Sequence, residues 1–296
     1  MSFAIQDHFA DPILDDMLSR EVIVDNRSNS NELEDYQVSL EIDEKQLFFE
    51  VQDGLRFVDE NLQIIDHWNE SFPDKEWIEV PKIPSSAICA LRMLDGDASS
   101  ASNGTNTFLF FDDFPGSSID TSKWSVTGNG ISVSGSIVTL TTSSTNTQNR
   151  LTSLTDWSKN NSSSLRARLK TQYSGATNRG EQTFGASDNT YYITAEYNHR
   201  HSQYSGKYYS NYNGDGFSNI VGWAADTWKI QELKRPGLAR WTVNDANQVN
   251  HSSYYPTNDY PIWIRADYNT NPATMWVDWI LIRKYASTEP LTYIGM

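Results

Sequence analysis

The clearest fold signal in this chain is the stretch Thr274-Met-Trp-Val-Asp-Trp-Ile-Leu-Ile-Arg-Lys-Tyr285. It is rich in β-branched and aromatic residues, which favour a β-strand. Successive side chains of a strand point to opposite faces, and here both faces are apolar around Asp278. We therefore predict a strand over 274–285 in an all-β domain.

The same kind of pattern extends through the rest of the chain, in short runs separated by turn residues. In the second half, Pro and Gly fall between the runs, apart from Pro261 at the start of 260–268, as an antiparallel sandwich requires. The predicted strands of the first part are 21–25, 36–42, 55–58, 77–81 and 87–93, and those of the second part are 131–133, 137–140, 165–171, 190–197, 207–212, 227–234, 239–243, 260–268 and 274–285. The fold class is all-β, with two β-sandwich (jelly-roll) domains in tandem and a short N-terminal helical segment.

Charge divides the chain into two unlike halves. Residues 1–108 carry 23 acidic and 7 basic side chains, a net charge of −16, whereas residues 109–296 carry 15 and 16, a net charge of +1. A small, polar stretch at 95–107 has the composition of a connector. The predicted organisation is therefore a docking segment at 1–20, an acidic β-sandwich at 21–107, a jelly-roll domain at 108–290 and a C-terminal tail at 291–296.

Composition excludes several classes of protein. The chain has no run of about 18 uncharged apolar residues, which membrane insertion of a helix would need. A net charge of −15 argues against nucleic acid as a general partner, because phosphates are neutralised by basic side chains. The single cysteine, Cys89, excludes an internal disulfide.

The first 20 residues predict a short amphipathic helix. Asp11-Pro12 is a typical N-cap and first-turn pair, and Ile13, Leu14, Met17 and Leu18 then share one face. Because so short a helix is unstable alone in water, this face must dock, either on its own first domain or on another subunit. The segment lacks the basic start of a signal peptide.

Two groups of motifs resemble known families. Val22-Ile-Val-Asp-Asn-Arg-Ser-Asn-Ser30, His67-Trp-Asn-Glu70 and Val80-Pro-Lys-Ile-Pro84 make residues 21–108 similar to a prokaryotic domain family of unknown function. Phe111-Asp-Asp-Phe114, Ile119-Asp-Thr-Ser-Lys-Trp124 and Trp276-Val-Asp-Trp279 make the remainder resemble the concanavalin A-like lectin/glucanase superfamily, which includes laminin G-like modules. The resemblance implies a pair of β-sandwiches and a role in surface or carbohydrate recognition, but no single function.

We predict that the second domain is not catalytic. Glycosidases need two carboxylates beside the scissile bond, and in the hydrolases of the resembling superfamily these stand close together on one strand. The second domain has four glutamates, none with an acidic neighbour two or three residues away. A convergence of Glu196 and Glu232 in space is the alternative, and solvated strand faces are the ordinary environment for both.

Calcium is the metal that the sequence favours. Asp278 interrupts an apolar strand, so its carboxylate must be paired, hydrogen-bonded or metal-bound. In the resembling glucanases an aspartate at this point binds calcium together with oxygens near the first strand, where Asp112 or Asp113 lies here. The alternative is that Asp278 accepts hydrogen bonds from the main chain or from an arginine such as Arg265. His199 and His201 could share one strand face, but no third ligand is evident.

An aromatic cluster is the strongest ligand signal. Seven tyrosines lie between 191 and 212, among asparagines, histidines and an arginine, and two tryptophans follow. Sugars stack on aromatic rings and bond to such polar groups, although aromatic residues also fill the core of any sandwich. The predicted ligand-binding residues are Tyr204, Tyr208, Tyr212, Asp215, Trp223, Trp228, His199 and Arg200.

Together these features predict a non-catalytic surface-binding or adhesion protein that recognises a glycan or host cell-surface receptor. Surface-type modules without an export signal fit a virion protein, such as a phage or archaeal virus tail, fibre or head-decoration subunit, exposed outside the cell. Such a protein would be a homo-oligomer or would attach to other subunits through residues 1–20. The alternatives are a secreted carbohydrate-active enzyme or its binding subunit, and an assembly subunit without a ligand.

Overall fold

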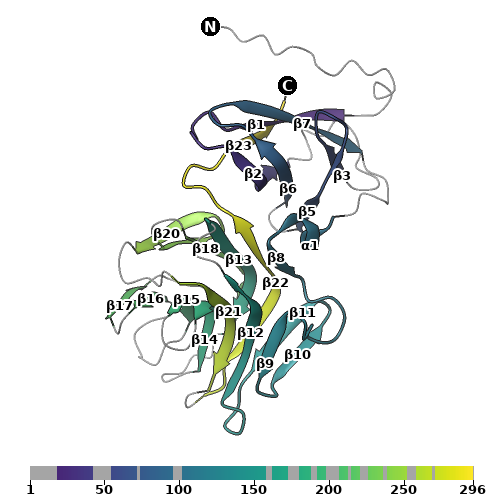
Figure 1. Ribbon diagram of the computed structural model, residues 1–296. Helices are drawn as coiled ribbons and strands as arrows, with labels where there is room; N and C mark the ends of the chain where they lie inside the picture. Colours follow the sequence, from purple (N-terminus) through teal and green to yellow (C-terminus); the bar gives the residue numbers. More distant parts are fainter. Residues whose placement is uncertain are drawn as a thin grey trace. The chain divides into compact units, whose positions relative to one another are not determined.

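The computed structural model describes residues 19–42, 55–71, 74–95, 102–157, 162–172, 180–187, 192–197, 207–212, 215–220, 226–235, 239–251, 258–268 and 271–295. Within these ranges the chain is built of β-strands and one short helix, α1 (Gly104–Thr107) (Figure 1). It forms two compact units, one of residues 1–108 with 287–296 and the other of residues 109–286. No helix in the described ranges has the length and apolar character needed to cross a membrane.

The first unit contains two antiparallel sheets. One has the strand order β23 (Leu291–Ile294), β1 (Ser19–Asp25), β7 (Ile88–Asp95), β3 (Leu55–Val58) and β4 (Ile64–Ile65), and the other has the order β2 (Leu33–Glu41), β6 (Asp74–Ile83) and β5 (His67–Ser71). Each sheet contributes fully buried apolar side chains, such as Val22 and Phe57 from the first and Leu40 and Ile78 from the second. The hydroxyl of Thr292 in β23 donates to the main-chain oxygen of Ser39 in β2, which links the two sheets.

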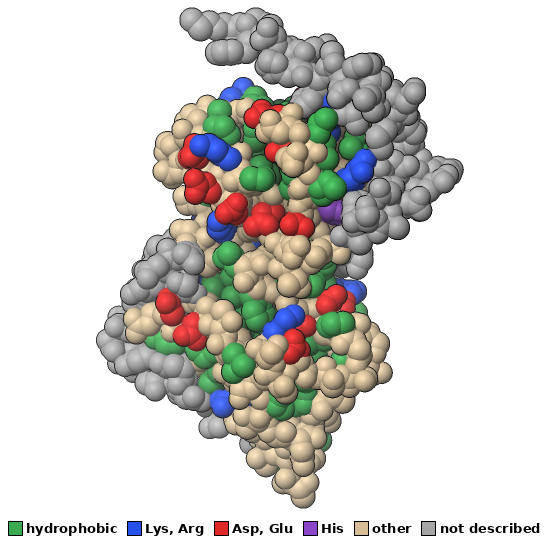
Figure 2. Space-filling view, turned by 45° about the vertical axis from the view of Figure 1, so that its right-hand side comes forward, with side chains coloured by type: hydrophobic (Ala, Val, Ile, Leu, Met, Phe, Trp, Pro, Cys, Tyr) green, Lys and Arg blue, Asp and Glu red, His purple; other side chains and the backbone are tan. Residues whose placement is uncertain are grey.

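The surface of the first unit is acidic. Figure 2 shows Asp and Glu side chains in several clusters on its visible face. Glu32, Glu34, Asp35 and Glu41 are among the exposed carboxylates, and they border β2 or lie within it. The excess of acidic over basic residues in this part of the chain therefore appears on the surface of the first unit.

The prediction of a C-terminal tail at 291–296 is wrong. Leu291–Ile294 is strand β23, which pairs with β1 through Val22↔Ile294 and Asp25↔Leu291. The segment before it is also anchored, because the side-chain amide of Asn29 donates to the main-chain oxygen of Thr288 at 3.1 Å. Residues 287–296 therefore belong to the first unit and not to the second, so the predicted second domain at 108–290 runs too far.

The second unit is a sandwich of two large antiparallel sheets. The eight-stranded sheet has the order β10 (Ile131–Ser134), β11 (Ile137–Thr141), β22 (Thr274–Lys284), β13 (Ser163–Thr171), β18 (Lys229–Lys234), β19 (Ala239–Val243) and β20 (Ala246–His251), with β8 (Phe110–Asp112) also pairing with β22. The seven-stranded sheet has the order β17 (Asp215–Ile220), β16 (Lys207–Tyr212), β15 (Tyr192–Tyr197), β14 (Glu181–Ser187), β21 (Tyr260–Asp267), β12 (Gln148–Trp157) and β9 (Trp124–Thr127). The all-β sandwich class predicted from the sequence is confirmed.

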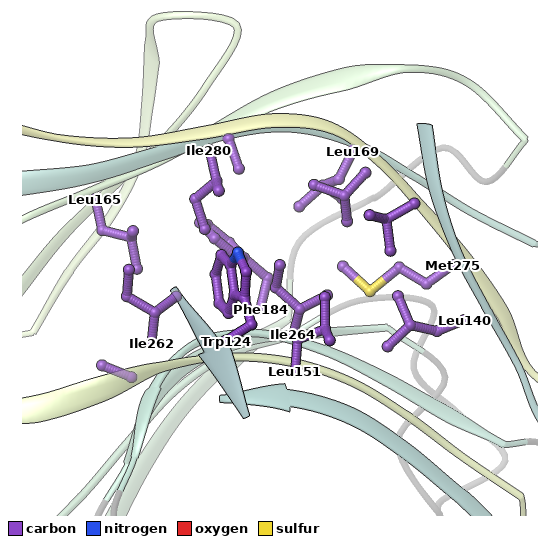
Figure 3. Packing of buried hydrophobic residues seen from close by; sticks show 14 of the residues in the cluster. Trp124, Leu140, Leu151, Leu165, Leu169, Phe184, Ile262, Ile264, Met275 and Ile280 are labelled. Carbon is purple, nitrogen blue, oxygen red and sulfur yellow. The ribbon is translucent and has the colours of Figure 1, made fainter. Parts of the chain in front are cut away.

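The core of the second unit lies between these sheets. Figure 3 shows Ile280 and Leu169 from the eight-stranded sheet facing Ile262 and Leu151 from the seven-stranded sheet, with Trp124 among them. Burial of each such side chain contributes about 1.5–3 kcal/mol. Because side chains alternate along a strand, the residues between the core positions point away from the core on each sheet.

The strand that decides the fold, β22, forms as predicted; most of its side chains are buried, Trp276 and Asp278 are half-buried, and Asp278 lies at a β-bulge. Leu169 pairs with Val277 and Arg168 pairs with Trp279, so Asp278 is the extra residue without an opposite partner. Met275 and Val277 are core residues, so alternation points Asp278 away from the core, and after the bulge the core positions are Ile280 and Ile282.

Candidate ligand-binding face of the second unit

The outer face of the seven-stranded sheet gathers polar and aromatic side chains. In β21, Ile262, Ile264 and Ala266 belong to the core cluster. The residues between them, Trp263 and Arg265, therefore point to the opposite face, and Asp267 follows the same alternation. This outer face, here called the Trp263 face, consists of Gln148, Arg150, Glu181, Thr183, Trp263, Arg265 and Asp267.

Two arginines lie directly opposite each other at its centre. Arg150 of β12 pairs with Arg265 of β21, which in turn pairs with Thr183 of β14. Like charges at this spacing repel, and each guanidinium has a compensating contact. Arg150 lies 4.6 Å from the centroid of the Trp263 ring, whereas Arg265 bonds to two carboxylates. Burial lowers the pKa of Arg150 below its ordinary value, and the charge of Arg265 lowers this pKa further.

The two carboxylates are also cross-strand neighbours, since Glu181 pairs with Asp267. The Glu181 carboxylate accepts from the Thr183 hydroxyl at 3.1 Å and from Arg265 at 3.5 Å. The Asp267 carboxylate accepts from the Gln148 amide at 3.1 Å and forms an ion pair with Arg265. Both carboxylates are thus held in place by protein donors.

Trp263 supplies the aromatic part of the face. It lies between Thr152 and Gly185 on the neighbouring strands, and the absence of a side chain at Gly185 leaves room for the indole ring. Trp263 is only 5% exposed, and the guanidinium of Arg265 lies 5.6 Å from its ring centroid. The indole ring therefore holds the two arginines in position, and the polar groups around it are those that a polyhydroxylated ligand can bond.

Part of the predicted ligand-binding cluster lies outside the described residues, namely Tyr204, Trp223, His199 and Arg200. Tyr208 and Tyr212 lie in β16 and Asp215 begins β17, with Tyr212 directly opposite Asp215. Their strands belong to the seven-stranded sheet, but their side chains are also outside the description.

Trp228 separates from this group. It precedes β18 and therefore belongs to the eight-stranded sheet, where Arg168 lies 4.9 Å from its ring centroid. The tyrosines of β16 belong to the seven-stranded sheet, and the chain crosses from one sheet to the other between β17 and β18. That Trp228 shares one site with these tyrosines stays a prediction, because their side chains lie outside the description.

The predicted calcium ligands do not fit a shared site. Asp112 is fully buried, and its carboxylate accepts from the Trp124 indole at 2.6 Å and from the main-chain N–H of Phe114 at 2.9 Å. Asp278 instead forms an ion pair with Arg168, not with Arg265 as the sequence alternative suggested. No group of three or more potential metal ligands occurs in the described part of the chain.

The two glutamates considered for catalysis lie on different sheets. Glu196 is in β15, opposite Thr183 and Lys207, while Glu232 is in β18. Glu232 is 1% exposed and bonds to Arg166, Arg283 and Ser164. The prediction of a solvated Glu232 is therefore wrong, because this carboxylate is the buried centre of an ionic network.

Sequence reasoning missed the Trp263 face. The alternating sequence Ile262-Trp-Ile-Arg-Ala-Asp267 indicates this face, because every second residue of a strand points the same way. Trp263, Arg265 and Asp267 therefore lie on the face opposite the apolar residues. Their partners Arg150 and Glu181 come from distant parts of the sequence, and only the strand order brings them together.

Comparison with known proteins finds a match to one family of unknown function and a similarity of fold to solved structures. The model of a family described as "Domain of unknown function (DUF2341)" matches residues 52–127, which cross from the first unit into the second, whereas the sequence prediction placed such a family at 21–108. No curated protein matches the chain.

Among solved structures, the chain is similar to a β-1,3-glucanase from Mycobacterium marinum, with 14% identity over 59% of this chain and 98% of that chain and a TM-score of 0.50. A Bacillus licheniformis β-glucanase has 15% identity over 60% and 98%, with a TM-score of 0.49. A pseudo β-1,3-glucanase of Mycobacterium tuberculosis has 14% identity over 62% and 100%, also with a TM-score of 0.49. The first of these likenesses shows a shared glucanase-type β-sandwich fold, and fold alone names no activity.

Proposed function

We propose that the second unit binds carbohydrate without cleaving it, through the Trp263 face. The observation that supports this most directly is the combination of an aromatic ring, two arginines and two carboxylates on one outer sheet face. Hydroxyl groups of a sugar can donate to Glu181 and Asp267 and accept from Arg150 and Gln148.

Binding explains this geometry better than acid–base catalysis does. A glycosidase needs one carboxylic acid that donates a proton to the leaving group and a second carboxylate that acts as nucleophile or base. Glu181 and Asp267 share the same arginine, so their environments are alike and do not separate these two roles. They serve better as fixed acceptors.

Affinity electrophoresis in gels that contain laminarin, galactan, polygalacturonate or chondroitin sulfate tests the proposal. We expect at least one polysaccharide to retard the protein, and Arg150→Gln to weaken its binding about tenfold, because a hydrogen bond to a charged group is lost. Arg27→Gln is the matched control, since Arg27 is an exposed arginine of the first unit that pairs with Asp25. The proposal fails if no polysaccharide retards the protein, or if Arg150→Gln and Trp263→Phe leave all retardation unchanged.

A glycoside hydrolase is the second candidate function. One register observation favours it: Glu196 occupies the same cross-strand row as Thr183, Arg265 and Arg150, so its strand position belongs to the Trp263 face. Release of reducing sugar from any polysaccharide of the panel, abolished by Glu196→Gln, would establish this activity and replace the binding-only proposal.

We infer for the whole chain a role in surface adhesion, as a structural subunit of a virion tail, fibre or head decoration that meets a host glycan or receptor. The acidic first unit would serve as a spacer, and the N-terminal residues would attach it to other subunits. Copurification with capsid or tail proteins from infected cells would support this role, and association with a secreted enzyme complex would contradict it.

A further inference from the structure

A row of side chains crosses the outer face of the eight-stranded sheet, on the side away from the core. Trp276 of β22 lies opposite Thr139 of β11 and opposite Lys170 of β13. On the other side of Lys170, the pair Leu169↔Lys229 places Trp228, one residue before Lys229, beside Lys170. We call Thr139, Trp276, Lys170 and Trp228 the Trp–Lys–Trp row.

The row places one ammonium group between two indole rings. The Lys170 Nζ atom lies 4.3 Å from the centroid of Trp276 and 5.3 Å from that of Trp228. All three residues are half-buried, so none of them belongs to the closed core. A cation at this distance is attracted by the ring faces, which fixes its position.

The neighbouring arginine shows what Lys170 lacks. Arg168 also lies over Trp228, at 4.9 Å, and its charge is balanced by an ion pair with Asp278. For Lys170, the described residues supply two aromatic rings but no carboxylate and no hydrogen-bond acceptor. The row therefore holds an ordered positive charge whose hydrogen-bond donors have no acceptor among the described residues.

Hydroxyl groups border the row on the same face. Thr139 is part of it, and Thr141 and Thr274 form the next cross-strand pair, with their hydroxyl oxygens 3.5 Å apart. A ligand that matches these groups has an apolar ring face for an indole, an anion for Lys170 and hydroxyls for the threonines. An anionic sugar combines all three.

We propose that the Trp–Lys–Trp row is a second carbohydrate site, which binds an anionic sugar residue of a polysaccharide through its carboxylate or sulfate group. The Lys170 ammonium bonds the anion, and the ring of Trp276 or Trp228 stacks on the sugar. The site is on the opposite sheet from the Trp263 face and does not depend on it. A single-stranded nucleic acid also offers flat rings and anions, but its stacked bases lack the hydroxyl groups that would match the threonines beside the row.

Calorimetric titration of the full chain with two matched pairs of polymers tests the proposal. Polygalacturonate is compared with its methyl ester, and carrageenan with its desulfated form, so that each pair differs in the anion alone. We expect tighter binding of the anionic member of at least one pair, and its weakening by about tenfold or more in Lys170→Gln. Binding of the neutral members should not change, and Lys170→Arg should retain most of the affinity.

Lys82→Gln is the control for the lost charge, because Lys82 is an exposed lysine of the first unit. If Lys170→Gln lowers the stability of the protein, Trp276→Phe is the second variant. It keeps an aromatic ring and tests whether the indole contributes to binding of the anionic polymer by stacking. Equal binding of anionic and neutral members, or unchanged anion binding in Lys170→Gln, overturns the proposal. So does tighter binding of oligo(dT) than of any polysaccharide. If Arg150→Gln abolishes all binding while Lys170→Gln has no effect, the proposed function stands and this inference fails.

Discussion

At the scale of single residues, Glu232 is the most constrained charge in the described part of the second unit. Its carboxylate accepts from the Ser164 hydroxyl at 2.7 Å and from Arg283 at 3.0 Å, and Arg166 lies 3.3 Å away. Arg166 also bonds to Asp245 at 2.6 Å, at the turn between β19 and β20. Burial alone would raise the pKa of Glu232, but the charges of Arg283, Arg166 and Lys234, with the Ser164 hydroxyl, lower it from 4.5 to about 2.

This pKa shift predicts an acid-labile fold. Between pH 4.5 and about 2 the unfolded chain protonates Glu232 while the folded chain does not, so folding stability falls as the pH drops through this window. The contribution at neutral pH is about 3 kcal/mol, and it is fully present above pH 4.5. Urea unfolding of the wild type and Glu232→Gln across this range measures it, and the variant should lose this part of the pH dependence.

Glu232→Gln at pH 7 should lower the free energy of unfolding by about 3–5 kcal/mol, because two buried arginines lose their counter-charge. Glu32→Gln is the matched control: its side chain is 44% exposed and that of its ion-pair partner Lys82 is 61% exposed, so the substitution should change stability by less than about 0.5 kcal/mol. Equal effects of the two substitutions would mean that the buried network does not stabilise the fold.

At the scale of secondary structure, the sequence predicted strands in which apolar residues alternate with polar ones or follow one another in a short run. The runs 131–133, 137–140, 207–212 and 239–243 correspond closely to β10, β11, β16 and β19. It missed β14, Glu-Gln-Thr-Phe-Gly-Ala-Ser, because the outward residues there are polar and a glycine interrupts the pattern. Missing β14 also hid Glu181 and Thr183, so the Trp263 face could not be assembled from the sequence.

The most consequential error at this scale concerns β23. Leu291–Ile294 is only four residues long, and its partner β1 lies some 270 positions away in the sequence, so no local pattern reveals the pairing. Its apolar residues are also poorly buried, since Leu291 is 68% exposed. From the sequence, such a short and exposed edge strand is predicted to be a C-terminal tail, although it completes the sheet.

Truncation after Ala286 tests the role of β23. We expect the first unit to unfold at a lower temperature, because β1 loses its ladder from Val22 to Asp25 and becomes an exposed edge. The truncated protein should also aggregate more readily, through the freed strand edge. Differential scanning calorimetry with light scattering measures both effects. A control that retains Leu291–Ile294 but carries Leu291→Ser should melt as the wild type does, and an unchanged midpoint in the truncated chain would make β23 dispensable.

At the scale of the whole molecule, the structural division sharpens the charge asymmetry. With residues 287–296 assigned to the first unit, that unit carries 24 acidic and 7 basic side chains, a net charge of −17. The second unit then carries 14 and 16, a net charge of +2. A weakly positive unit with two candidate carbohydrate faces can approach an anionic polymer, whereas the acidic unit is repelled by it. This asymmetry favours approach of such a polymer through the second unit.

Whether the chain acts alone is predicted to depend on the N-terminal segment. The predicted docking segment at 1–20 must end two residues earlier, because Ser19 and Arg20 already pair with Leu94 and Met93 in β1. A chain that begins at Ser19 after an initiator methionine therefore keeps the whole first sheet. If residues 1–18 attach the chain to other subunits, this deletion should leave the melting temperature unchanged and abolish self-association, as measured by calorimetry and by size exclusion with light scattering.

A full-length variant has serine in place of Ile13, Leu14, Met17 and Leu18. It tests the contribution of the apolar face alone, because the length and the acidic residues of the segment are unchanged. It should behave as the deletion does, because the predicted helix has only this face to bury. A lower melting temperature in both variants, with the oligomeric state unchanged, would mean that the segment packs on its own first unit. The acidic surface of that unit would then be a solubilising spacer without an anchor.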